Sequence, residues 1–385
     1  MNQKHLAILC GVLDEGNPVS DQVIDLANQL ADQGYRVSLL ALAKIHAEID
    51  PRITVFIKGP RPRRLWLGMI RFQRWIDRQI ETLKPDHTIS TLSSVSASIM
   101  VPMTGTKRGR ARARRRLHPG PVTRFLMRLQ SLRVDRLVMN LLERRAMSSN
   151  SISCFVALTP LIELDLKAYA PHSSQPIQAA SIREMDRPTD PTLSNKIRQQ
   201  FARAFNISHE SYWIIHPFVD IQLDGFETAI RAFAPLIKQG GDVTLLLAGP
   251  TRYTHLAWIG ELGLREHVRF IGKTQHMQQL MAACDLVLNP TVHDPLGAHV
   301  REAIRAGKPV ITTHGSGAAD LVPPNTCTLL PAATDPAEVL EAIRKHHAQW
   351  QENPEQSAPI ASKPPSKPSL GQIIAQIVQE TAPEA

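Results

Sequence analysis

CDLVLNPTVHDPLGAHVREAIRAGKPVITTHGSGAADLV, residues 284–322, is the stretch of this 385-residue chain that decides its fold. The apolar run Leu286–Asn289 predicts a buried strand, and Pro290 and Pro295 keep the residues that follow it out of a helix. Apolar residues recur at helical spacing from Gly297 onward, and Val310–Thr313 predicts the next strand. The stretch therefore indicates a strand, a loop, a helix and a second strand, followed by a glycine-rich turn.

The start of that helix is a candidate site for a phosphate beside a polyol. The first-turn amides of Gly297, Ala298 and His299 lack partners within the helix and, with the helix dipole, favour an anion. Asp294 precedes this turn and is placed to accept hydrogen bonds from sugar hydroxyls, while Glu302 is placed to accept two from a ribose diol. The alternative is that Asp294 only starts the helix and Glu302 is a solvated charge.

The stretch resembles the E-x7-E region of the retaining GT-B glycosyltransferases of family 4, and especially that of the lipopolysaccharide core glucosyltransferases. Asp294 and Glu302 stand at the two acidic positions of this region. The residues that match the rest of the pattern are Ala303, Gly307, Lys308, Pro309, Val310, Gly315 and Gly317. The resemblance implies that Asp294 is the catalytic residue that contacts the donor sugar, and that Glu302 binds the donor ribose.

The resemblance extends upstream to the strand Leu245–Gly249 and to the segment Val268–Asp285. It implies that Gly249, Gly272 and Lys273 also belong to the donor site, together with the amides of the turn at Gly297. It further implies transfer with retention of anomeric configuration and without an essential metal or cofactor. The donor is then a nucleotide diphosphate sugar, for which we expect a UDP-sugar.

The sequence departs from the family where the donor diphosphate binds. The family's basic pair before a glycine falls on Leu223 and Asp224, and its strand-end glycine falls on Phe218. A carboxylate repels a diphosphate, and losing a charged contact typically costs a few kcal/mol. Two interpretations stay open: a basic residue from elsewhere, such as Arg252 or Lys273, neutralises the donor, or the donor site is degenerate.

The whole chain alternates predicted strands and helices, which favours parallel sheets in an α/β fold. The predicted strands are Leu6–Val12, Val37–Leu42, Ile53–Lys58, His87–Leu92, Ser153–Leu158, Trp213–Pro217, Val243–Ala248, Val268–Ile271, Leu286–Asn289 and Val310–Thr313. We expect the GT-B architecture, two doubly wound Rossmann-like domains facing a cleft that holds the ligand.

The domain boundaries follow from composition and pattern. We expect an N-terminal acceptor domain over residues 1–185 and a nucleotide-sugar domain over residues 186–350, which is consistent with the length of the chain. Residues 351–369 are rich in proline and serine and are expected to form a linker. Residues 370–385 include an apolar helical face, and the resemblance implies that this helix packs on the N-terminal domain.

Composition limits the compartment. The cysteines are far apart and lie in or beside apolar runs, which predicts buried free thiols and no metal site; they are Cys10, Cys154, Cys284 and Cys327. No N-terminal segment has the build of a signal peptide, and no apolar run is long enough to span a bilayer. We therefore expect a cytoplasmic protein that is peripheral on the inner face of the membrane.

The positive charge is concentrated in one segment. Residues 107–145 hold thirteen Lys and Arg against Asp135 and Glu143, whereas the whole chain has a net charge of +9. KRGRARARRR, residues 107–116, is a charge run with little to fold it, and Val122–Arg145 is expected to be a basic amphipathic helix, within a segment bounded by residues 105–147. Three interpretations compete: an anionic membrane or glycolipid surface, which we favour, a solvated helix with a core face, and a nucleic-acid patch. The segment has a single aromatic residue, Phe125, so we expect no nucleic-acid partner.

Three functions follow from the sequence. The first is a glycosyltransferase that moves a hexose from a nucleotide diphosphate sugar to a lipid-linked or lipopolysaccharide-type acceptor. The second is a catalytically degenerate homologue that acts as a binding or partner protein. The third is a nucleic-acid-binding protein that uses the arginine-rich stretch.

Overall fold

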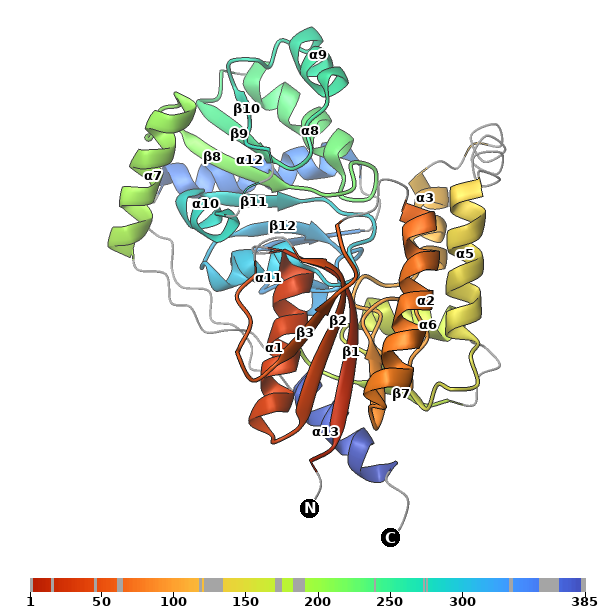
Figure 1. The fold of residues 1–385 in the computed structure, drawn as a ribbon. Helices are drawn as coiled ribbons and strands as arrows, with labels where there is room; N and C mark the ends of the chain where they lie inside the picture. The colour runs from red at the N-terminus through yellow and green to blue at the C-terminus, as the bar shows by residue number, and fades with distance from the viewer. Residues whose placement is uncertain are drawn as a thin grey trace. The chain divides into compact units, whose positions relative to one another are not determined.

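The computed structural model describes residues 3–14, 17–44, 47–60, 65–117, 120, 134–169, 175–182, 191–238, 240–272, 274, 276–331, 335–352 and 367–381. The chain forms two compact units. The first consists of Met1–Glu184 together with Pro365–Ala385, and the second of Met185–Pro364. Each unit contains one parallel sheet (Figure 1).

The first unit is built on seven described strands in the order β3-β2-β1-β4-β5-β6-β7. Neighbouring strands in this order pair in parallel throughout. The strands are β1 (His5–Leu13), β2 (Arg36–Lys44), β3 (Thr54–Ile57), β4 (His87–Ser90), β5 (Ile99–Met100), β6 (Cys154–Ala157) and β7 (Ile177–Ala179). The helices are α1 (Pro18–Asp32), α2 (Leu65–Leu83), α3 (Lys107–Leu117), α5 (Val134–Met147), α6 (Pro160–Tyr169) and α13 (Leu370–Glu380).

The C-terminal helix α13 packs on α1 although the two lie at opposite ends of the sequence (Figure 1). Ser369 caps α13, and its Oγ also donates to Gln29 Oε1 of α1 at 2.8 Å. Gly371 lets the helices approach, because a Cβ there would lie 2.7 Å from the Gln29 side chain. The face of α13 that this packing buries is apolar and consists of Leu370, Ile373, Ile374, Ile377 and Val378.

The basic run 107–116 is helical, so the expectation that little would fold it is wrong. Arg and Ala are strong helix formers, and the N-terminus of α3 is well capped: Thr106 Oγ1 accepts from Gly109 N at 2.9 Å. The buried carboxylate of Glu143 accepts from Lys107 N at 2.9 Å. Of the amphipathic helix expected over Val122–Arg145, residues 121–133 lie outside the described part of the chain, and the remainder belongs to α5.

The second unit is built on six described strands in the order β10-β9-β8-β11-β12-β13, again all parallel. The strands are β8 (Tyr212–Pro217), β9 (Val243–Ala248), β10 (Val268–Phe270), β11 (Leu286–Asn289), β12 (Val310–Thr313) and β13 (Thr328–Leu330). The helices are α7 (Pro191–Phe205), α8 (Phe226–Lys238), α9 (Tyr253–Glu261), α10 (Met277–Ala283), α11 (Ala298–Arg305), the short 3-10 helix η1 (Ala319–Leu321) and α12 (Pro336–Glu352).

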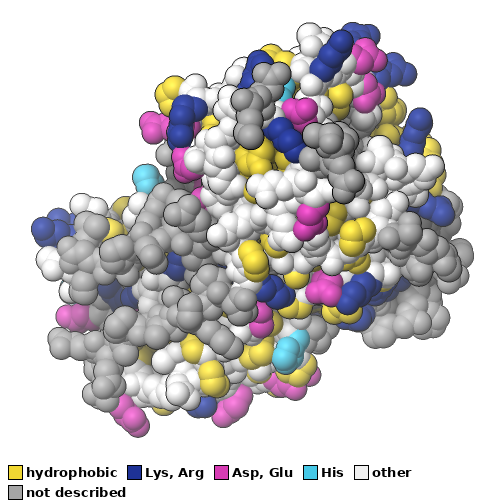
Figure 2. Space-filling view, turned by 90° about the horizontal axis from the view of Figure 1, so that it is seen from below, with side chains coloured by type: hydrophobic (Ala, Val, Ile, Leu, Met, Phe, Trp, Pro, Cys, Tyr) yellow, Lys and Arg dark blue, Asp and Glu magenta, His cyan; other side chains and the backbone are white. Residues whose placement is uncertain are grey.

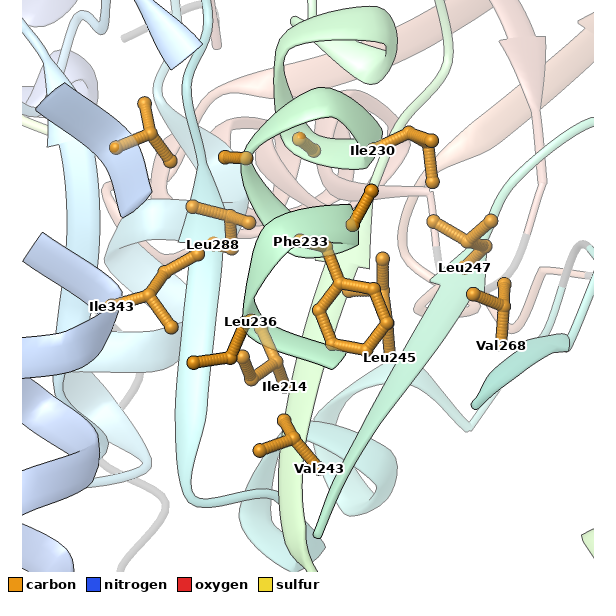
Figure 3. Close-up of a cluster of buried hydrophobic side chains, with 14 of the residues drawn as sticks. Ile214, Ile230, Phe233, Leu236, Val243, Leu245, Leu247, Val268, Leu288 and Ile343 are labelled. Atoms are coloured by element: carbon orange, nitrogen blue, oxygen red, sulfur yellow. The ribbon is translucent and has the colours of Figure 1, made fainter. Parts of the chain in front are cut away.

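The core of the second unit lies between its sheet and the helices that cover it. Figure 3 shows Phe233 and Leu236 of α8 against Ile214 of β8 and Leu245 of β9. All four side chains are buried. Burying such side chains contributes roughly 1.5–3 kcal/mol each, which holds the carboxyl ends of β8, β9 and β11 in a fixed frame.

The predicted fold class is confirmed: both sheets are parallel, and each is wound in two directions from its first strand. All ten predicted strands are present, with boundaries that differ by a few residues. Three further strands were not predicted, β5, β7 and β13. They have only two or three residues, too few to show a hydrophobic period.

The four cysteines are buried and free, as predicted. None of the described helices combines the length and apolarity needed to cross a bilayer. Figure 2 shows one face of the molecule, on which described basic and acidic side chains are interspersed.

Candidate ligand site at the carboxyl ends of β8 and β11

The strand order of the second unit reverses between β8 and β11. In open parallel sheets, the loops that leave the carboxyl ends of the strands at such a reversal form the usual ligand site. The loop after β8 runs to Gly225 and contains Asp224, and the loop after β11 contains Asp294. These two carboxylates are close enough for the charge of Asp294 to raise the pKa of Asp224.

The backbone of Asp294 is fixed against the glycine-rich turn after β12. Asp294 N donates to Gly315 O at 2.9 Å, and Gly317 N donates to Asp294 O at 2.7 Å. The carboxylate Oδ1 accepts from Gly297 N at 3.1 Å. Asp294 therefore stabilises the start of α11, and the side chain remains partly exposed at the site.

Gly297 is required at the start of α11 for two reasons. Its φ of +65° lies in the left-handed region, and a Cβ there would lie 2.4 Å from Ala318 N and 2.9 Å from Ser316 Oγ. As the N-cap residue, Gly297 has no side chain that could accept from the first-turn amides. Because Gly297 N donates to Asp294, the uncapped first-turn amides offered to a ligand are those of Ala298 and His299.

Glu302 and His299 face each other one turn apart on α11. His299 Nδ1 lies 3.5 Å from Glu302 Oε2, longer than a good hydrogen bond. Both atoms are buried and have no hydrogen-bond partner among the described residues. Glu302 is 9% exposed, so the alternative in which it is a solvated charge is wrong. Buried carboxylate oxygens normally accept a hydrogen bond, and a ligand hydroxyl could donate one to Glu302 Oε2.

The imidazole of His299 is surrounded by acids. Burial opposes its charged form, but the Glu302 carboxylate that faces it at 3.5 Å and the negative charges of Asp294 and Asp224 outweigh burial and raise its pKa. The carboxylates around His299 therefore favour the charged form of its imidazole.

His216 at the end of β8 belongs to the same cluster, although sequence reasoning did not select it. Its Nδ1–H donates to Leu288 O of β11 at 2.8 Å, while Nε2 is buried without a hydrogen-bond partner in the described structure. Burial lowers its pKa to about 4, and the charge of His299 acts in the same direction. His216 is therefore neutral at physiological pH and presents a free acceptor nitrogen. The sequence feature that could have identified it as a site residue is its position as the penultimate residue of a predicted strand.

Asp224 has turned inward onto its own loop. Its Oδ2 accepts from Val219 N at 2.6 Å and from Asp220 N at 2.8 Å. Burial raises the pKa of this carboxyl to about 6, with Asp294 acting in the same direction, while the two N–H donors lower it. The Asp224 carboxylate thus occupies two amides of the loop.

The glycines and Phe218 around this loop are fixed by close packing. A Cβ on Gly225 would lie 2.1 Å from Pro290 O, and one on Gly249 would lie 2.3 Å from Phe218 O. The Phe218 ring is buried and stacks on His216 with ring centroids 5.5 Å apart. The loop after β8 is therefore held by β9 on one side and by the loop after β11 on the other.

The remaining predicted residues are more distant or lie outside the described chain. Gly272 follows β10 with a φ of +72°, and a Cβ at this position would meet no atom within 4 Å. Lys273 lies outside the described residues. Arg252 is exposed at the start of α9. The structure thus brings together Asp294, Gly297, Ala298, His299 and Glu302, and it adds His216 and Asp224.

This arrangement suits a ligand that has hydroxyl groups and an anion. Glu302 Oε2 and His216 Nε2 are acceptors without donors, and hydroxyls supply donors. The first-turn amides of Ala298 and His299, together with an imidazole whose charged form is favoured, suit a phosphate oxygen. No group of His, Cys, Asp and Glu in the described residues has the arrangement of a metal site.

Comparison with known proteins agrees with this geometry. Residues 217–349 match the family described as Glycosyl transferases group 1, so the resemblance inferred from residues 284–322 is confirmed at that level for this part of the chain. A 2-deoxystreptamine glucosyltransferase of Streptomyces kanamyceticus is 34% identical over 125 residues, 31% of this chain and 32% of that protein. The lipopolysaccharide glucosyltransferase WaaG of Escherichia coli K12 is 29% identical over 167 residues, 40% of this chain and 44% of that protein. The chain thus matches less than half the length of these relatives.

Solved structures share the fold over nearly the whole chain. The crystal structure of WaaG, a glycosyltransferase involved in lipopolysaccharide biosynthesis, superposes with a TM-score of 0.72 at 17% identity and covers 97% of this chain and 99% of that one. Anabaena Alr3699/HepE in complex with UDP and glucose gives a TM-score of 0.61 at 19% identity, covering 97% and 98%. The fold is therefore GT-B, with two Rossmann-like parallel sheets, as predicted.

Proposed function

We propose that this protein is a retaining glycosyltransferase that moves a hexose from a nucleotide diphosphate sugar to a lipid-linked or lipopolysaccharide-type acceptor. The observation that carries the proposal is the buried Glu302 Oε2, which has no donor and lies beside the uncapped first turn of α11. The group 1 match over residues 217–349 includes this site. Relatives named as glucosyltransferases, and a similar fold bound to UDP and glucose, favour a UDP-sugar as the donor.

Each group of the site then has a role. Glu302 accepts hydrogen bonds from the ribose hydroxyls, and the amides of Ala298 and His299 bind phosphate oxygens. The imidazole of His299, whose charged form the neighbouring carboxylates favour, offsets part of the negative charge that develops on the departing diphosphate. Asp294 orients the sugar and is the catalytic residue of the proposal. Gly249, Gly272 and Lys273 are assigned to the rim of the donor site on the resemblance alone.

Isothermal titration calorimetry with UDP-glucose tests the donor site. Glu302→Gln removes the carboxylate charge but keeps the size of the side chain, and we expect affinity to fall by about tenfold to a hundredfold, as for a lost hydrogen bond to a charged group. Glu261→Gln is the matched control, because Glu261 is an exposed acid at the end of α9. Equal affinities of the two variants would contradict the assignment of Glu302.

A second candidate function is a catalytically degenerate homologue that binds a partner or glycan without turnover. The observation that favours it is the carboxylate of Asp224 on the amides of Val219 and Asp220, where the resembled family has a basic residue. A coupled assay for UDP release separates the candidates. Binding of UDP-glucose without UDP release, in the presence of lipopolysaccharide-type acceptors, would favour the degenerate homologue.

The proposed acceptor side is an anionic membrane surface that contacts residues 107–145. Helices α3 and α5 pack together in the first unit. Val134, Leu137 and Leu141 of α5 are 62%, 47% and 66% exposed. The exposed arginines of the two helices are Arg108, Arg112, Arg115, Arg116, Arg136, Arg144 and Arg145. Apolar side chains among arginines suit the headgroup region of an anionic bilayer, where each basic residue gains about 1 kcal/mol.

Vesicle flotation tests this surface. We expect the wild-type protein to float with vesicles that contain phosphatidylglycerol and to stay behind with pure phosphatidylcholine. Arg112, Arg115 and Arg116 changed together to Gln should lose most of the binding, whereas Arg71, Arg74 and Arg78 of α2 changed to Gln serve as a control with equal loss of charge. Unchanged flotation of the first variant would contradict the proposal. We propose, on the basis of this surface, that the protein is cytoplasmic and peripheral on the inner face of the membrane. The proposal includes no nucleic-acid partner.

A further inference from the structure

The loop after β8 contains two consecutive amides that already hold an anion. Val219 N and Asp220 N both donate to Asp224 Oδ2, at 2.6 Å and 2.8 Å. Asp224 N in turn donates to Asp220 O at 2.8 Å, so the loop closes on itself. Adjacent backbone N–H groups that point to one place are the feature by which loops at strand ends bind phosphate oxygens. Asp224 therefore occupies the place and satisfies the donors that a phosphate would use.

The loop is too firmly held to turn these amides elsewhere. Leu223 O accepts from Val292 N at 2.7 Å and from Thr291 Oγ1 at 2.9 Å. The next residue but one, Gly225, packs directly on Pro290 O. At the other end of the loop, Phe218 N donates to Ala248 O at 3.0 Å. Because both ends of the loop are fixed, a phosphate gains the amides of Val219 and Asp220 only when the Asp224 carboxylate leaves them or loses its charge.

We infer that Asp224 is a built-in competitor of the donor phosphate, and that it sets the affinity of this site for a nucleoside diphosphate sugar. The inference rests on the proposed function and deepens it, because it assigns to this residue the selection of the donor by charge. Its carboxylate both blocks the amide pair and adds negative charge to a site that already contains Asp294 and Glu302. Ligands without a phosphate do not meet this competition.

The groups that face Asp224 act in opposite directions. Asp220 lies in the same loop, Asp294 comes from the loop after β11, and His299 comes from α11. The charge of Asp294 disfavours ionisation of Asp224, whereas the backbone N–H of Asp220 favours it. The imidazole of His299, when protonated, favours both the carboxylate and a phosphate. Because His299 attracts either anion, the effect of Asp224 is isolated by comparing the wild type with an Asp224 variant at the same pH.

Calorimetric titration of wild type, Asp224→Asn and Asp220→Asn at pH 7.5 tests the inference. Asp220→Asn is the matched control: it removes one charge from the same loop, but the Asp220 carboxylate accepts from Gln222 N and Leu223 N and not from the amide pair. We expect Asp224→Asn to bind UDP-glucose about tenfold more tightly, Asp220→Asn to change affinity by less than about threefold, and no variant to alter the affinity for uridine, which has no phosphate.

Measurement against pH gives a second readout. The diphosphate of UDP-glucose does not titrate between pH 5 and 8, so the ratio of the two dissociation constants, wild type over Asp224→Asn, reports on Asp224. We expect this ratio to fall toward one as the pH is lowered to about 5, where Asp224 in the wild type is protonated. If Asp224→Asn does not fold, Asp224→Ser takes its place, since a hydroxyl still accepts from one amide.

The outcomes separate the inference from the proposed function. UDP-glucose binding that is equal in wild type and Asp224→Asn, or weaker in the variant, overturns the inference and makes Asp224 a structural cap, while the donor site stands. Binding in no variant overturns the proposed donor and the inference with it. Tighter binding of both UDP-glucose and uridine in Asp224→Asn also overturns the inference, because the effect would then not depend on phosphate.

Discussion

The candidate site of the second unit concentrates charge that a folded protein usually keeps apart. Three carboxylates, Asp224, Asp294 and Glu302, surround the imidazole of His299. Only part of their hydrogen-bonding capacity is used, because Glu302 Oε2 has no donor in the described structure. Such unsatisfied buried groups reduce stability and are usually retained where a ligand completes them. The residues of this site are therefore expected to gain both stability and order when a ligand binds.

Gly297→Ala should destabilise the second unit by about 2–4 kcal/mol. The new Cβ would adopt a left-handed conformation and would collide with Ala318 N, which is 2.4 Å away. Gly263→Ala is the control: Gly263 has a similar φ of +72° but nothing within 4 Å, so only the conformational cost of about 1 kcal/mol applies. Urea denaturation measures the unfolding free energy of both variants. Equal losses of unfolding free energy would show that residues 316–318 move to accommodate the new Cβ.

Asp224→Asn should stabilise the protein in a pH-dependent way. Burial raises the pKa of Asp224 to about 6, whereas an aspartate in an unfolded chain titrates near about 3.9. The folded state therefore binds this proton more tightly, and the wild type loses stability as the pH rises from about 4 to about 6. Relative to the wild type, the unfolding free energy of the variant should be little changed at pH 4 and about 1–3 kcal/mol higher at pH 7. Urea denaturation across this range would contradict the prediction if the gain did not change with pH.

At the scale of one element, helix α3 shows how a strongly basic segment is kept folded. Its N-terminus meets two buried carboxylates, and each is satisfied. Glu143 accepts from Ser93 Oγ at 2.6 Å and from Lys107 N at 2.9 Å, and Asp165 accepts from Thr106 N at 3.3 Å. Negative charge at a helix N-terminus is favourable. The two acids thus stabilise the start of α3, and Arg108, Arg112, Arg115 and Arg116 are exposed.

Glu143→Gln should loosen α3 without unfolding the sheet. The amide side chain keeps one acceptor oxygen but loses the charge, and we expect a loss of about 1–3 kcal/mol of unfolding free energy. Hydrogen exchange should quicken at the amides of Lys107–Leu117 more than at those of β1. Glu81→Gln, an exposed acid on α2, is the control. Unchanged exchange in α3 would mean that the helix does not depend on the carboxylate.

At the scale of the whole molecule, the C-terminal helix belongs to the unit that contains the N-terminus. Besides the contacts of α13 with α1, Lys4 Nζ donates to Val378 O at 2.8 Å. The last helix of the first unit therefore follows the whole second unit in the sequence. Residues 1–184 alone lack the apolar face of α13, so the first unit depends on both ends of the chain.

Ile374→Ser tests this dependence. Ile374 is fully buried, and its replacement by a small polar side chain should cost about 2–4 kcal/mol, expressed in the first unit only. Gln376→Ser on the exposed side of α13 is the control. Hydrogen exchange should quicken in α1 and β1 and stay unchanged in β8 and β9. Equal exchange in the two variants would mean that α13 adds no stability to the first unit.

The sequence by itself determined the fold class, ten of the described strands, the buried free cysteines and the place of Asp294 and Glu302 at the start of α11. These features are local, because hydrophobic period, proline and glycine act on neighbouring residues. The helical state of residues 107–117 was missed, since it depends in part on the distant Glu143.

Only the tertiary structure decided the burial, the protonation and the hydrogen-bond partners of the side chains in this site. The burial of Glu302, the neutral His216 with its free nitrogen, and the inward turn of Asp224 onto two loop amides depend on loops from different strands that meet at one edge of the sheet. Whether a carboxylate is solvated, protonated or engaged by amides is set by what packs around it, and residues far apart in the sequence supply that packing.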